Sequence, residues 1–363
     1  MPIQLYLQLR IITQTLGENL RHLLSIVMEL FEDISIKPYN SFGIQAQSQW
    51  LVNIKSFLEL KHFLESEWNH YSRKLILGGG SNVLFTRDYR GLILRPIIKG
   101  IEIVEENEKD VYVRAMCGEN WDEFVAFCLE REWYGLENLS LIPGNVGACP
   151  IQNIGAYGKE VKDAIFTVEA IDLSTFETVS LSNAECEFGY RSSIFKTKQK
   201  DKYIIYAVVF KLSKIKELNT DYVDVQRELE NYEIIDIKAV RSAISAIRWR
   251  KLPDPNCIGN AGSFFKNPII SLENYNLNKE KYPSIPGFPC GIDEVKVSAA
   301  WLIEQISYKG VRKGDVGTSP VQPLVIVNYG DATGQEILNF AQEIQSEVMD
   351  VFGICLEIEV NVI

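Results

Sequence analysis

A glycine turn between two strand-like segments limits the folds that this chain can adopt. Residues 74–85 read KLILGGGSNVLF, so an apolar run meets the turn and then resumes. A Rossmann fingerprint needs a glycine at position 83 and a helix after it, but residue 83 is valine and the P-loop pattern is missing too. The turn consists of Gly78, Gly79, Gly80, Ser81 and Asn82. It is either a plain tight turn or an anion-binding nest of backbone amides.

A second glycine-dense stretch, residues 141–158, reads LIPGNVGACPIQNIGAYG. Four glycines in so short a segment cost conformational entropy, and a close approach of the backbone to a flat or phosphorylated ligand would explain that cost. A structural loop is an equally open interpretation. Two such stretches in one chain favour a dinucleotide that is bound without a Rossmann fold.

Helical and strand patterns are interleaved along the chain. One predicted helix follows the cap residue Ser56 and has an apolar face that extends to Trp68. A second helix follows Asn120, and a third follows Thr333 with an apolar face that ends at Val351. Strand patterns occupy residues 110–118, 166–181, 203–213, 324–328 and 354–363. We therefore expect the α+β class.

Length and charge restrict the classes of function. A chain of 363 residues is expected to form two or three domains, and the prolines after residue 249 predict a boundary there. The balance of 37 basic and 48 acidic residues gives 37 − 48 = −11, which opposes binding to nucleic acid or to a lipid surface. No apolar run is long enough for an ordinary membrane span. Seven cysteines without a C-x-x-C pair favour reduced thiols in the cytoplasm over a zinc site, so no metal is expected.

The distribution of histidine excludes much of hydrolytic chemistry. The three histidines are His22, His62 and His70, all in the first fifth of the chain. Ser263 lies in GNAGSFFKNP (259–268), where no histidine is near in the sequence. A Ser-His-Asp triad is therefore not expected. Ser263 is either a turn residue or a group that gives up a proton.

Two charged residues have two open interpretations each, and a third has an ordinary structural one. Arg191, in EFGYRSSIFK, is either a planar fork for a carboxylate or phosphate, or half of a surface ion pair. Lys251, in KLPDP, is either a phosphate contact or a solvated side chain. Glu359 lies on the polar side of a predicted strand, where an acidic residue is normally exposed to water.

Taken together, these stretches resemble the UDP-N-acetylenolpyruvoylglucosamine reductase family from residue 40 to the C-terminus. The motifs occur in family order: GGGSNVLF, GLENLSLIPGNVGACPIQNIGAYG, FGYRSSIF, KLPDP, GNAGSFFKNP and LEIEV. The resemblance implies an FAD-binding region of the vanillyl-alcohol-oxidase/PCMH type, split into two lobes, and a third α+β domain that binds substrate. The expected divisions are an N-terminal extension with a possibly non-native start (1–27), lobe one (28–99, with the C-terminal strand 354–363), lobe two (100–248) and the substrate domain (249–353).

The resemblance also implies roles for individual residues. Ser263 is similar to the family's proton donor, and Arg191 and Glu359 resemble the pair that polarises the substrate carboxylate. The FAD contacts implied are Gly78, Gly79, Gly80, Ser81, Asn82, Pro143, Gly144, Gly147, Ala148, Asn153, Gly155 and Ala156. The substrate contacts implied are Tyr157, Tyr190, Tyr222, Lys251, Asn267 and Gln322. The glycine that usually follows the covering tyrosine is Val223 here. The stretch GACP departs from the commoner glycine- or serine-rich version of its loop and places Cys149 near the implied flavin; Cys149 receives no role.

The implied reaction is the reduction of UDP-N-acetyl-3-O-(1-carboxyvinyl)glucosamine to UDP-N-acetylmuramate, in the synthesis of peptidoglycan precursors for the cell wall. NADPH would reduce FAD, the flavin would pass a hydride to the enolpyruvyl methylene carbon, and Ser263 would supply the proton. We expect a cytoplasmic monomer whose partners are NADPH and the nucleotide sugar. The alternatives are another FAD-linked oxidase of the same fold and a non-catalytic binder of UDP-sugars.

Overall fold

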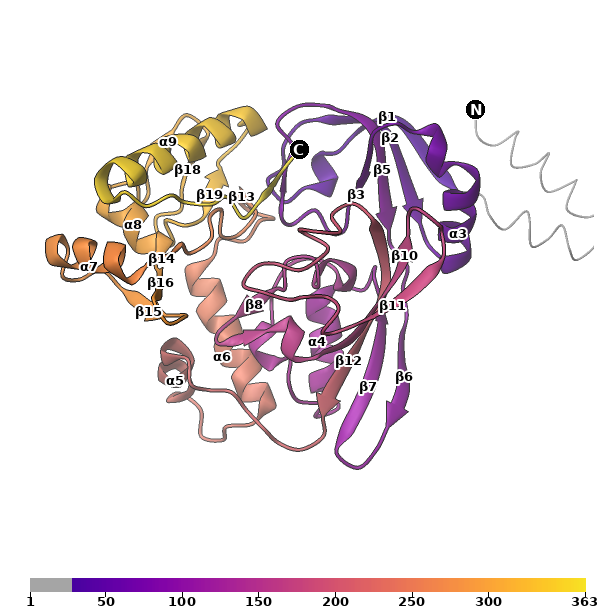
Figure 1. The fold of residues 1–363 in the computed structure, drawn as a ribbon, viewed down its shortest axis with the longest axis horizontal. Helices are drawn as coiled ribbons and strands as arrows, with labels where there is room; N and C mark the ends of the chain where they lie inside the picture. Colours follow the sequence, from indigo (N-terminus) through magenta and orange to yellow (C-terminus); the bar gives the residue numbers. More distant parts are fainter. Residues whose placement is uncertain (1–27) are drawn as a thin grey trace, which may run out of the picture.

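The computed structural model describes residues 28–363, so the extension expected at 1–27 lies outside the described residues. Within this range the chain forms an N-terminal unit, a middle unit and a C-terminal unit, which occupy separate regions of Figure 1. Each unit contains strands and at least one helix, so the predicted α+β class is confirmed. The limits of the three expected domains stay a prediction.

The N-terminal unit is a mixed sheet with the strand order β1-β2-β5-β3. Strand β2 pairs antiparallel with β1 and parallel with β5, and β5 pairs parallel with β3. Its elements are β1 (Glu29–Ser35), β2 (Gln47–Ile54), α3 (Phe57–Ser66), β3 (Lys74–Ile76), β4 (Val83–Leu84) and β5 (Tyr89–Pro96). The glycine turn connects β3 to β4, and no helix follows it, as predicted.

The middle unit is an antiparallel sheet with the strand order β11-β10-β12-β7-β6. Its strands are β6 (Ile101–Glu106), β7 (Asp110–Met116), β10 (Ile165–Asp172), β11 (Thr178–Ser182) and β12 (Tyr203–Ser213), with the short pair β8 (Gly155–Ala156) and β9 (Lys159–Glu160). Its helices are α4 (Trp121–Leu129), α5 (Val223–Leu229) and α6 (Ile237–Lys251). Asp122 in α4 accepts two hydrogen bonds from Arg241 in α6, at 2.7 and 2.8 Å, which fixes the two helices together.

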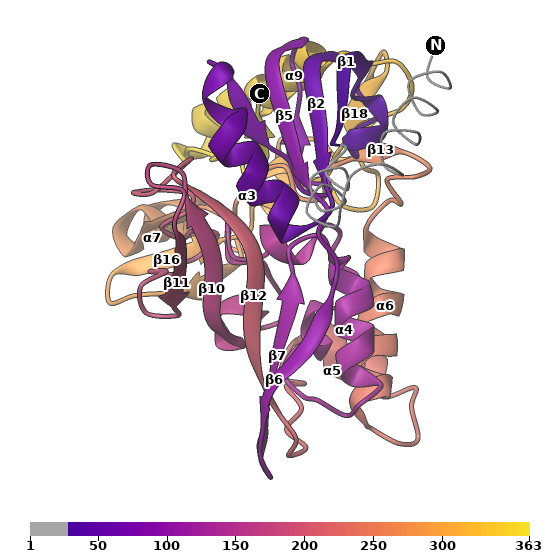
Figure 2. The same ribbon diagram turned by 90° about the vertical axis from the view of Figure 1, so that its right-hand side faces the viewer.

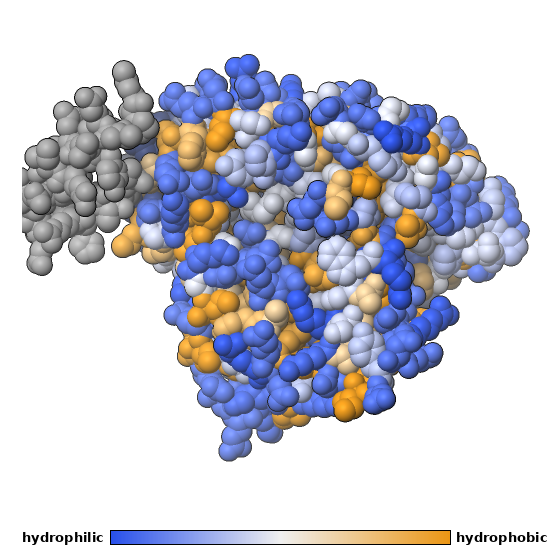
Figure 3. Space-filling view, turned by 180° about the vertical axis from the view of Figure 1, so that it is seen from behind, coloured by the Kyte–Doolittle hydropathy of each residue, from blue (hydrophilic) through white to orange (hydrophobic). Residues whose placement is uncertain are grey.

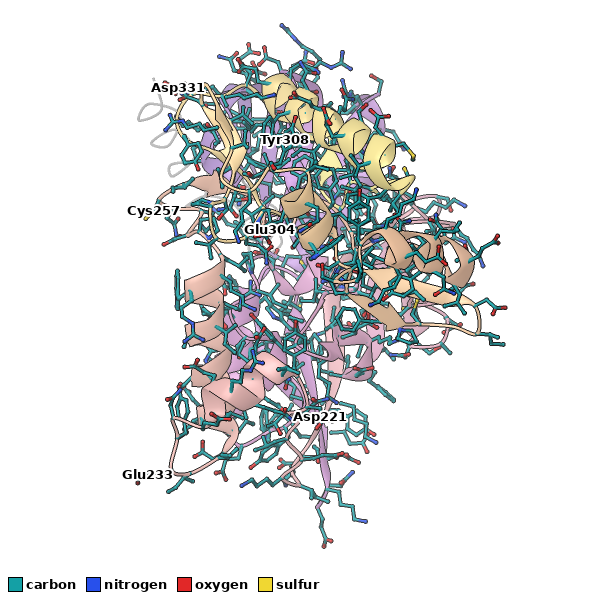
Figure 4. The ribbon with its side chains drawn as sticks, turned by 90° about the vertical axis from the view of Figure 1, so that its left-hand side faces the viewer. Asp221, Glu233, Cys257, Glu304, Tyr308 and Asp331 are labelled. Carbon is teal, nitrogen blue, oxygen red and sulfur yellow. The ribbon has the colours of Figure 1, made fainter. Side chains whose placement is uncertain are left out.

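The C-terminal unit combines two small sheets, ordered β13-β19-β18-β17 and β14-β16-β15, with three helices. The strands are β13 (Gly259–Asn260), β14 (Ile269–Ser271), β15 (Gly287–Pro289), β16 (Glu294–Val297), β17 (Arg312–Lys313), β18 (Val316–Thr318) and β19 (Ile326–Asn328). The helices are α7 (Leu272–Lys281), α8 (Ala299–Gln305) and α9 (Gly334–Phe352). Helix α6 leads into this unit from the middle unit, with the loop that carries Cys257 at one end and the loop that carries Glu233 at the other (Figure 4).

The hydrophobic core crosses the boundaries of the units. One cluster joins Phe42 and Phe85 of the N-terminal unit to Phe264 and Ile337 of the C-terminal unit, all of them at most 1% exposed. A second cluster packs helix α3 against strands β10 and β12 of the middle unit. Figure 2 shows α3 across the junction between the sheet of the N-terminal unit and the sheet of the middle unit. Because burial of large apolar side chains dominates stability, the three units are held as one body.

Two predictions about helix ends need correction. Helix α3 ends at Ser66, and Trp68 starts a separate 3-10 turn, so it lies outside the predicted helix. Val351 is 43% exposed, because Phe352 occupies the last position on the apolar face of α9, where it packs against Tyr282 and Trp301.

The C-terminal segment and the boundary at 249 also differ from expectation. Residues 354–360 alternate largely as predicted, but only β20 (Asn361–Val362) is a strand, paired with β4. Glu357 and Glu359 bond to the C-terminal unit, whereas Asn361 and Ile363 bond to the N-terminal unit, so this change of partner interrupts a regular ladder. Helix α6 continues to Lys251 and ends before Pro253, two residues beyond the predicted boundary.

Polar residues predominate on the face of the molecule drawn in Figure 3, in agreement with the charge of −11. None of the helices between residues 28 and 363 is long and apolar enough to cross a membrane.

Gly334→Ala tests the close packing at the start of α9. Alanine favours a helix over glycine, but a Cβ at this position would lie 1.9 Å from the carbonyl oxygen of Phe85. We expect a loss of about 1–3 kcal/mol in the free energy of unfolding, measured by urea denaturation. Ser346→Ala, on the exposed side of the same helix, is the control and should change that free energy by less than about 0.5 kcal/mol. Equal stability of the two variants would contradict the close contact.

Candidate active site

A buried ion pair joins the middle unit to the C-terminal segment. The Nε atom of Arg191 lies 3.1 Å from Oε1 of Glu359, and the two side chains are only 22% and 11% exposed. The Nη2 atom of Arg191 donates to the carbonyl oxygen of Gly155 at 2.8 Å. Arg191 itself has φ +51°, in a tight turn closed by backbone hydrogen bonds between Gly189 and Ser192. A strained backbone here indicates that the position of this guanidinium is fixed by its surroundings.

The electrostatics of this pair depend on burial. Burial raises the pKa of the Glu359 carboxyl, and the cations Arg191, Lys196 and Lys266 oppose that rise. The Nε of Arg191 faces Glu359 without the alignment of a hydrogen bond, and it is buried with no other partner among residues 28–363. Glu359 is therefore not the exposed acid of a polar strand face, and the ion-pair interpretation of Arg191 holds, although the pair is buried and not on the surface.

Ser263 is brought beside Glu359 by backbone pairing. The N–H of Glu359 donates to the carbonyl oxygen of Phe264 at 2.8 Å, one residue after Ser263. Gly262, at φ +70°, turns the chain before it, and the Gly262 N–H donates to Oδ1 of Asn260 at 3.0 Å. Ser263 is half-buried, and its hydroxyl makes no hydrogen bond to another protein group in the described part of the chain. The hydroxyl is therefore free to contact a ligand.

The glycines before Ser263 have a structural reason. A Cβ on Gly259 would lie 2.2 Å from the carbonyl oxygen of Phe42, so only glycine allows this approach to the N-terminal unit. The amide group of Asn260 donates to the carbonyl oxygens of Pro253 and Ile258. The loop that carries Ser263 is thus fixed on both sides.

Tyr190 and Asn267 connect the middle and C-terminal units at the same site. Burial raises the pKa of Tyr190, while Arg191 and Asn267 oppose the rise and Glu359 adds to it. The Nζ atom of Lys296, in β16, lies 4.9 Å from the centre of the Tyr190 ring. Oδ1 of Asn267 accepts from the N–H of Ala299 at 2.9 Å, so the Asn267 side chain is held at the start of α8.

Tyr157 and Tyr222 form a second cluster. Their rings meet edge to face, with centroids 5.4 Å apart. Burial raises the pKa of Tyr157, and the neighbouring cation Arg248 opposes this rise. Tyr222 is 44% exposed at the start of α5, and Lys251 forms an ion pair with Asp224 of that helix at 2.5 Å. Tyr157 follows Gly155 by two residues, so this cluster adjoins the Arg191 pair.

The two glycine-dense stretches face each other. Oγ of Ser81 donates to the carbonyl oxygen of Pro143 at 3.2 Å, and Nδ2 of Asn82 donates to Oε1 of Gln152 at 2.7 Å. A Cβ on Gly79 would meet Gly144 at 3.1 Å, and a Cβ on Gly80, at φ +68°, would lie 2.0 Å from the carbonyl oxygen of Tyr39. Glycine is required at position 80, and at position 79 it allows the close approach of the two turns.

Other predicted cofactor contacts adjoin these turns. Gly147 lies against Cys117, where a Cβ would come within 2.5 Å of the Cys117 Cβ. Asn153 is fully buried; it donates to the carbonyl oxygen of Gly189 and accepts from the N–H of Lys162, so its side chain supports the turn that carries Arg191. Gly155 and Ala156 form β8.

A cavity of about 670 Å³ lies between the N-terminal and middle units and the C-terminal segment. Gly78, Gly147 and Ala148 line it, together with Lys196 and residues 360–363. Its size is that of a cofactor site. Burial raises the pKa of the Cys117 thiol in its wall to about 12, and it also raises that of Cys149, so both sulfurs stay protonated.

The cavity fits FAD in three respects. Glycine backbone without Cβ atoms forms part of its wall, which lets a flat or phosphorylated group approach the amides. Apolar side chains such as Ile151, Phe195 and Val360 supply surface for an aromatic ring. The cations that line it suit an anionic dinucleotide.

The structure does not unite every predicted residue. The described contacts of Gln322 are with Ser319 and Val325, inside its own loop, and none joins it to the Arg191 pair. No group of three acidic, cysteine or histidine side chains within residues 28–363 could hold a metal ion. Sequence reasoning missed Lys196, Arg248 and Lys266; Lys196 and Lys266 lie inside quoted motifs, and Arg248 lies in the basic end of α6, IRWRK (247–251).

Comparisons with known proteins agree with this geometry. Residues 254–363 match the family described as "UDP-N-acetylenolpyruvoylglucosamine reductase, C-terminal domain", and residues 51–182 match "FAD binding domain". The second match confirms the expected FAD-binding region across the N-terminal and middle units.

Individual proteins are also similar to this chain over nearly its whole length. The UDP-N-acetylenolpyruvoylglucosamine reductase of Flavobacterium johnsoniae is 48% identical, over 93% of this chain and 100% of the relative. That of Chromobacterium violaceum is 43% identical, over 92% and 99%. The crystal structure of the Thermus caldophilus reductase has a TM-score of 0.63 at 23% identity and covers 92% of this chain and 98% of its own, which shows a shared fold.

The coupling between Arg191 and Glu359 can be measured through stability. A carboxyl whose pKa is raised in the folded state makes the free energy of unfolding fall as the pH rises through that range. Arg191→Met removes an opposing cation, so the pKa of Glu359 should rise further, and the total fall in the free energy of unfolding above about pH 4.3, the ordinary pKa of glutamate, should grow by about 1.4 kcal/mol for each unit of that rise. Urea unfolding across this range measures the slope.

The control is the double variant Arg191→Met/Glu359→Gln, which lacks the titrating carboxyl. Its free energy of unfolding should fall less steeply with pH than that of Arg191→Met alone, because the two variants differ only in the carboxyl of Glu359. Identical slopes in the single and double variants would show that Glu359 does not titrate with a raised pKa, and identical slopes in Arg191→Met and the wild type would show that it is not coupled to Arg191.

Proposed function

Because the chain belongs to the UDP-N-acetylenolpyruvoylglucosamine reductase family, we propose that it reduces UDP-N-acetyl-3-O-(1-carboxyvinyl)glucosamine to UDP-N-acetylmuramate with NADPH as the electron donor. Membership of the family and the FAD-binding domain make it an FAD-binding oxidoreductase. The product is a precursor of peptidoglycan, and we place the reaction in the cytoplasm.

The observation that carries this proposal is the buried Arg191–Glu359 pair with Ser263 beside it. A cation of the middle unit and an acid of the C-terminal segment thus lie beside the stretch of the C-terminal unit that carries a free hydroxyl. Reduction of an enolpyruvyl ether needs these three properties, because negative charge develops next to a carboxylate and a proton must then be added.

FAD is held, in this proposal, by the two facing glycine turns and the cavity beside them. The amides of residues 78–82 and 143–148 would contact its phosphates, and Gly155 and Ala156 would adjoin its ring. Asn153 would act indirectly, because its side chain supports the turn that carries Arg191. When bound, FAD supplies hydride transfer, taking a hydride from NADPH and delivering one to the methylene carbon of the substrate.

Arg191 and Glu359 polarise the substrate. After the methylene carbon has gained a hydride, the negative charge lies on the adjacent carbon and in its carboxylate. The Arg191 Nε faces Glu359 and Nη2 donates to Gly155, so the remaining N–H groups of the guanidinium would be the donors for that carboxylate. Glu359 holds the guanidinium in orientation through their ion pair at 3.1 Å.

Ser263 adds the proton to the adjacent carbon. A hydroxyl is a weak acid, but a carbanion of enolate character is basic enough to take its proton when the two are held together. The fixed loop around Asn260 and Gly262 provides that position. Hydride and proton together saturate the double bond, which accounts for both hydrogens of the product.

The nucleotide sugar would lie along the clusters of Tyr157 with Tyr222 and of Tyr190 with Asn267. Lys251 is paired with Asp224, so it would exchange that partner for a phosphate when substrate binds. Tyr222 is exposed enough to close over a ligand, and Val223 in place of glycine restricts the backbone of that lid. Gln322 would join the site only through movement of its loop.

Ser263→Ala is the decisive test of the reaction. In anaerobic stopped-flow absorbance, NADPH should bleach the flavin of the variant at nearly the wild-type rate. Recovery of absorbance on addition of the enolpyruvyl nucleotide sugar should slow by at least about 100-fold, the typical contribution of a general acid.

Ser271→Ala is the matched control, because Ser271 caps α7 in the same unit and its loss should leave both phases unchanged. Equal slowing of bleaching and recovery in Ser263→Ala would contradict the role of proton donor. If wild-type absorbance recovered with oxygen but not with the nucleotide sugar, the protein would be an oxidase and the proposed reaction would be wrong.

A further inference from the structure

Lys196 is a buried cation without a partner. Its Nζ atom is inaccessible to water and makes no hydrogen bond to any group among residues 28–363. The side chain lines the 670 Å³ cavity, next to Phe195 and opposite the C-terminal Val360. Most buried polar groups have a partner, so an orphaned ammonium group at a cavity wall points to a ligand that completes its contacts.

The charges around Lys196 do not balance. Arg191 faces Glu359, and Lys266, whose side chain is 15% exposed, forms an ion pair with Glu357. Three cations therefore share two carboxylates, 3 − 2 = +1, and the unbalanced charge belongs to Lys196.

The other charged side chains of the cavity wall also have a net positive charge. Apart from Lys196, its charged side chains are Arg73, Lys74, Lys200 and Asp201, which is three cations against one carboxylate. A wall of this kind attracts an anion.

Keeping this ammonium buried costs free energy. Burial lowers the pKa of Lys196, Lys266 and Arg191 lower it further, and Glu359 and Glu357 oppose the change. A methionine or leucine at this position would avoid the cost. A negative charge that arrives in the cavity would offset it, because attraction between charges is strong where water is excluded.

We propose that the Lys196 ammonium group stabilises the negative charge that the flavin ring of FAD acquires on reduction. The ring is neutral when oxidised; a hydride brings two electrons and one proton, so the reduced ring has one negative charge if it takes up no second proton. The inference rests on the proposed function only in that FAD is the redox cofactor. Lys196 would thereby make the bound flavin easier to reduce.

The ring is a better partner for Lys196 than the phosphates of FAD. Lys196 is close enough to Arg191 and Glu359 to interact with both, and the ring must lie at that pair because hydride transfer requires contact with the substrate. The phosphates have the amides of the glycine turns. The charge of the phosphates is also the same in oxidised and reduced FAD, so a cation that contacts a phosphate would leave the midpoint potential unchanged.

Lys196→Met tests the proposal through the midpoint potential of the bound flavin, measured by anaerobic reductive titration against a reference dye. Loss of the cation should weaken binding of reduced FAD relative to oxidised FAD by at least tenfold, which lowers the potential by about 30 mV for a two-electron couple. Lys196→Arg should restore most of the potential. Lys200→Met removes the same charge from an exposed position on the same cavity and should leave the potential unchanged.

Two results would overturn the proposal. An unchanged potential with weaker binding of oxidised FAD would mean that Lys196 contacts a phosphate, and an unchanged potential with unchanged binding would mean that it contacts neither. The flavin absorbance band shows that each variant is folded and loaded, and Lys196→Gln replaces the methionine variant if that one fails to fold. A wild-type protein that ignored the nucleotide sugar would refute the proposed function, whereas the potential of Lys196→Met would still decide the role of Lys196.

Discussion

The C-terminal segment, residues 354–363, is the part on which the rest of the structure depends. Its backbone bonds to the C-terminal unit through Phe264 and Lys266, and to the N-terminal unit through Asn82 and Leu84. Its side chains Ile354, Leu356 and Val360 are buried in the core shared by these units. Between these anchors it presents Glu359 to Arg191 of the middle unit. One short segment therefore connects all three units at the point where the chemistry is placed.

The same connections couple cofactor and substrate residues. Asn82 of the glycine turn accepts from the N–H of Asn361 and donates to the carbonyl oxygen of Glu359, so the turn and the acid belong to one hydrogen-bonded network. Asn153 holds the turn of Arg191, and Gly155 accepts from the guanidinium. Three of the residues predicted as cofactor contacts, Asn82, Asn153 and Gly155, thus also position the ion pair. The density of glycine follows from these close backbone approaches as much as from ligand binding.

Local patterns predicted much of the fold. The capped helices after Ser56, Asn120 and Thr333 and the strand at 203–213 all form, because caps and periodicity act within a few residues. The errors lie where residues distant in the sequence decide the outcome. Phe352 replaces Val351 on the face of α9 because Tyr282 and Trp301 lie there. The C-terminal segment is not one regular strand because its backbone partners change from the C-terminal unit at residues 357 and 359 to the N-terminal unit at residues 361 and 363.

The sequence by itself determined the class of fold, the position of the glycine turns and the motifs that identify the family, since all three are local properties of the chain. It left Arg191 and Glu359 open as surface residues and gave no reason to single out Lys196. Only the tertiary structure buried these side chains together, and burial is what changes their chemistry: a charge removed from water takes its pKa and its partners from its neighbours in space.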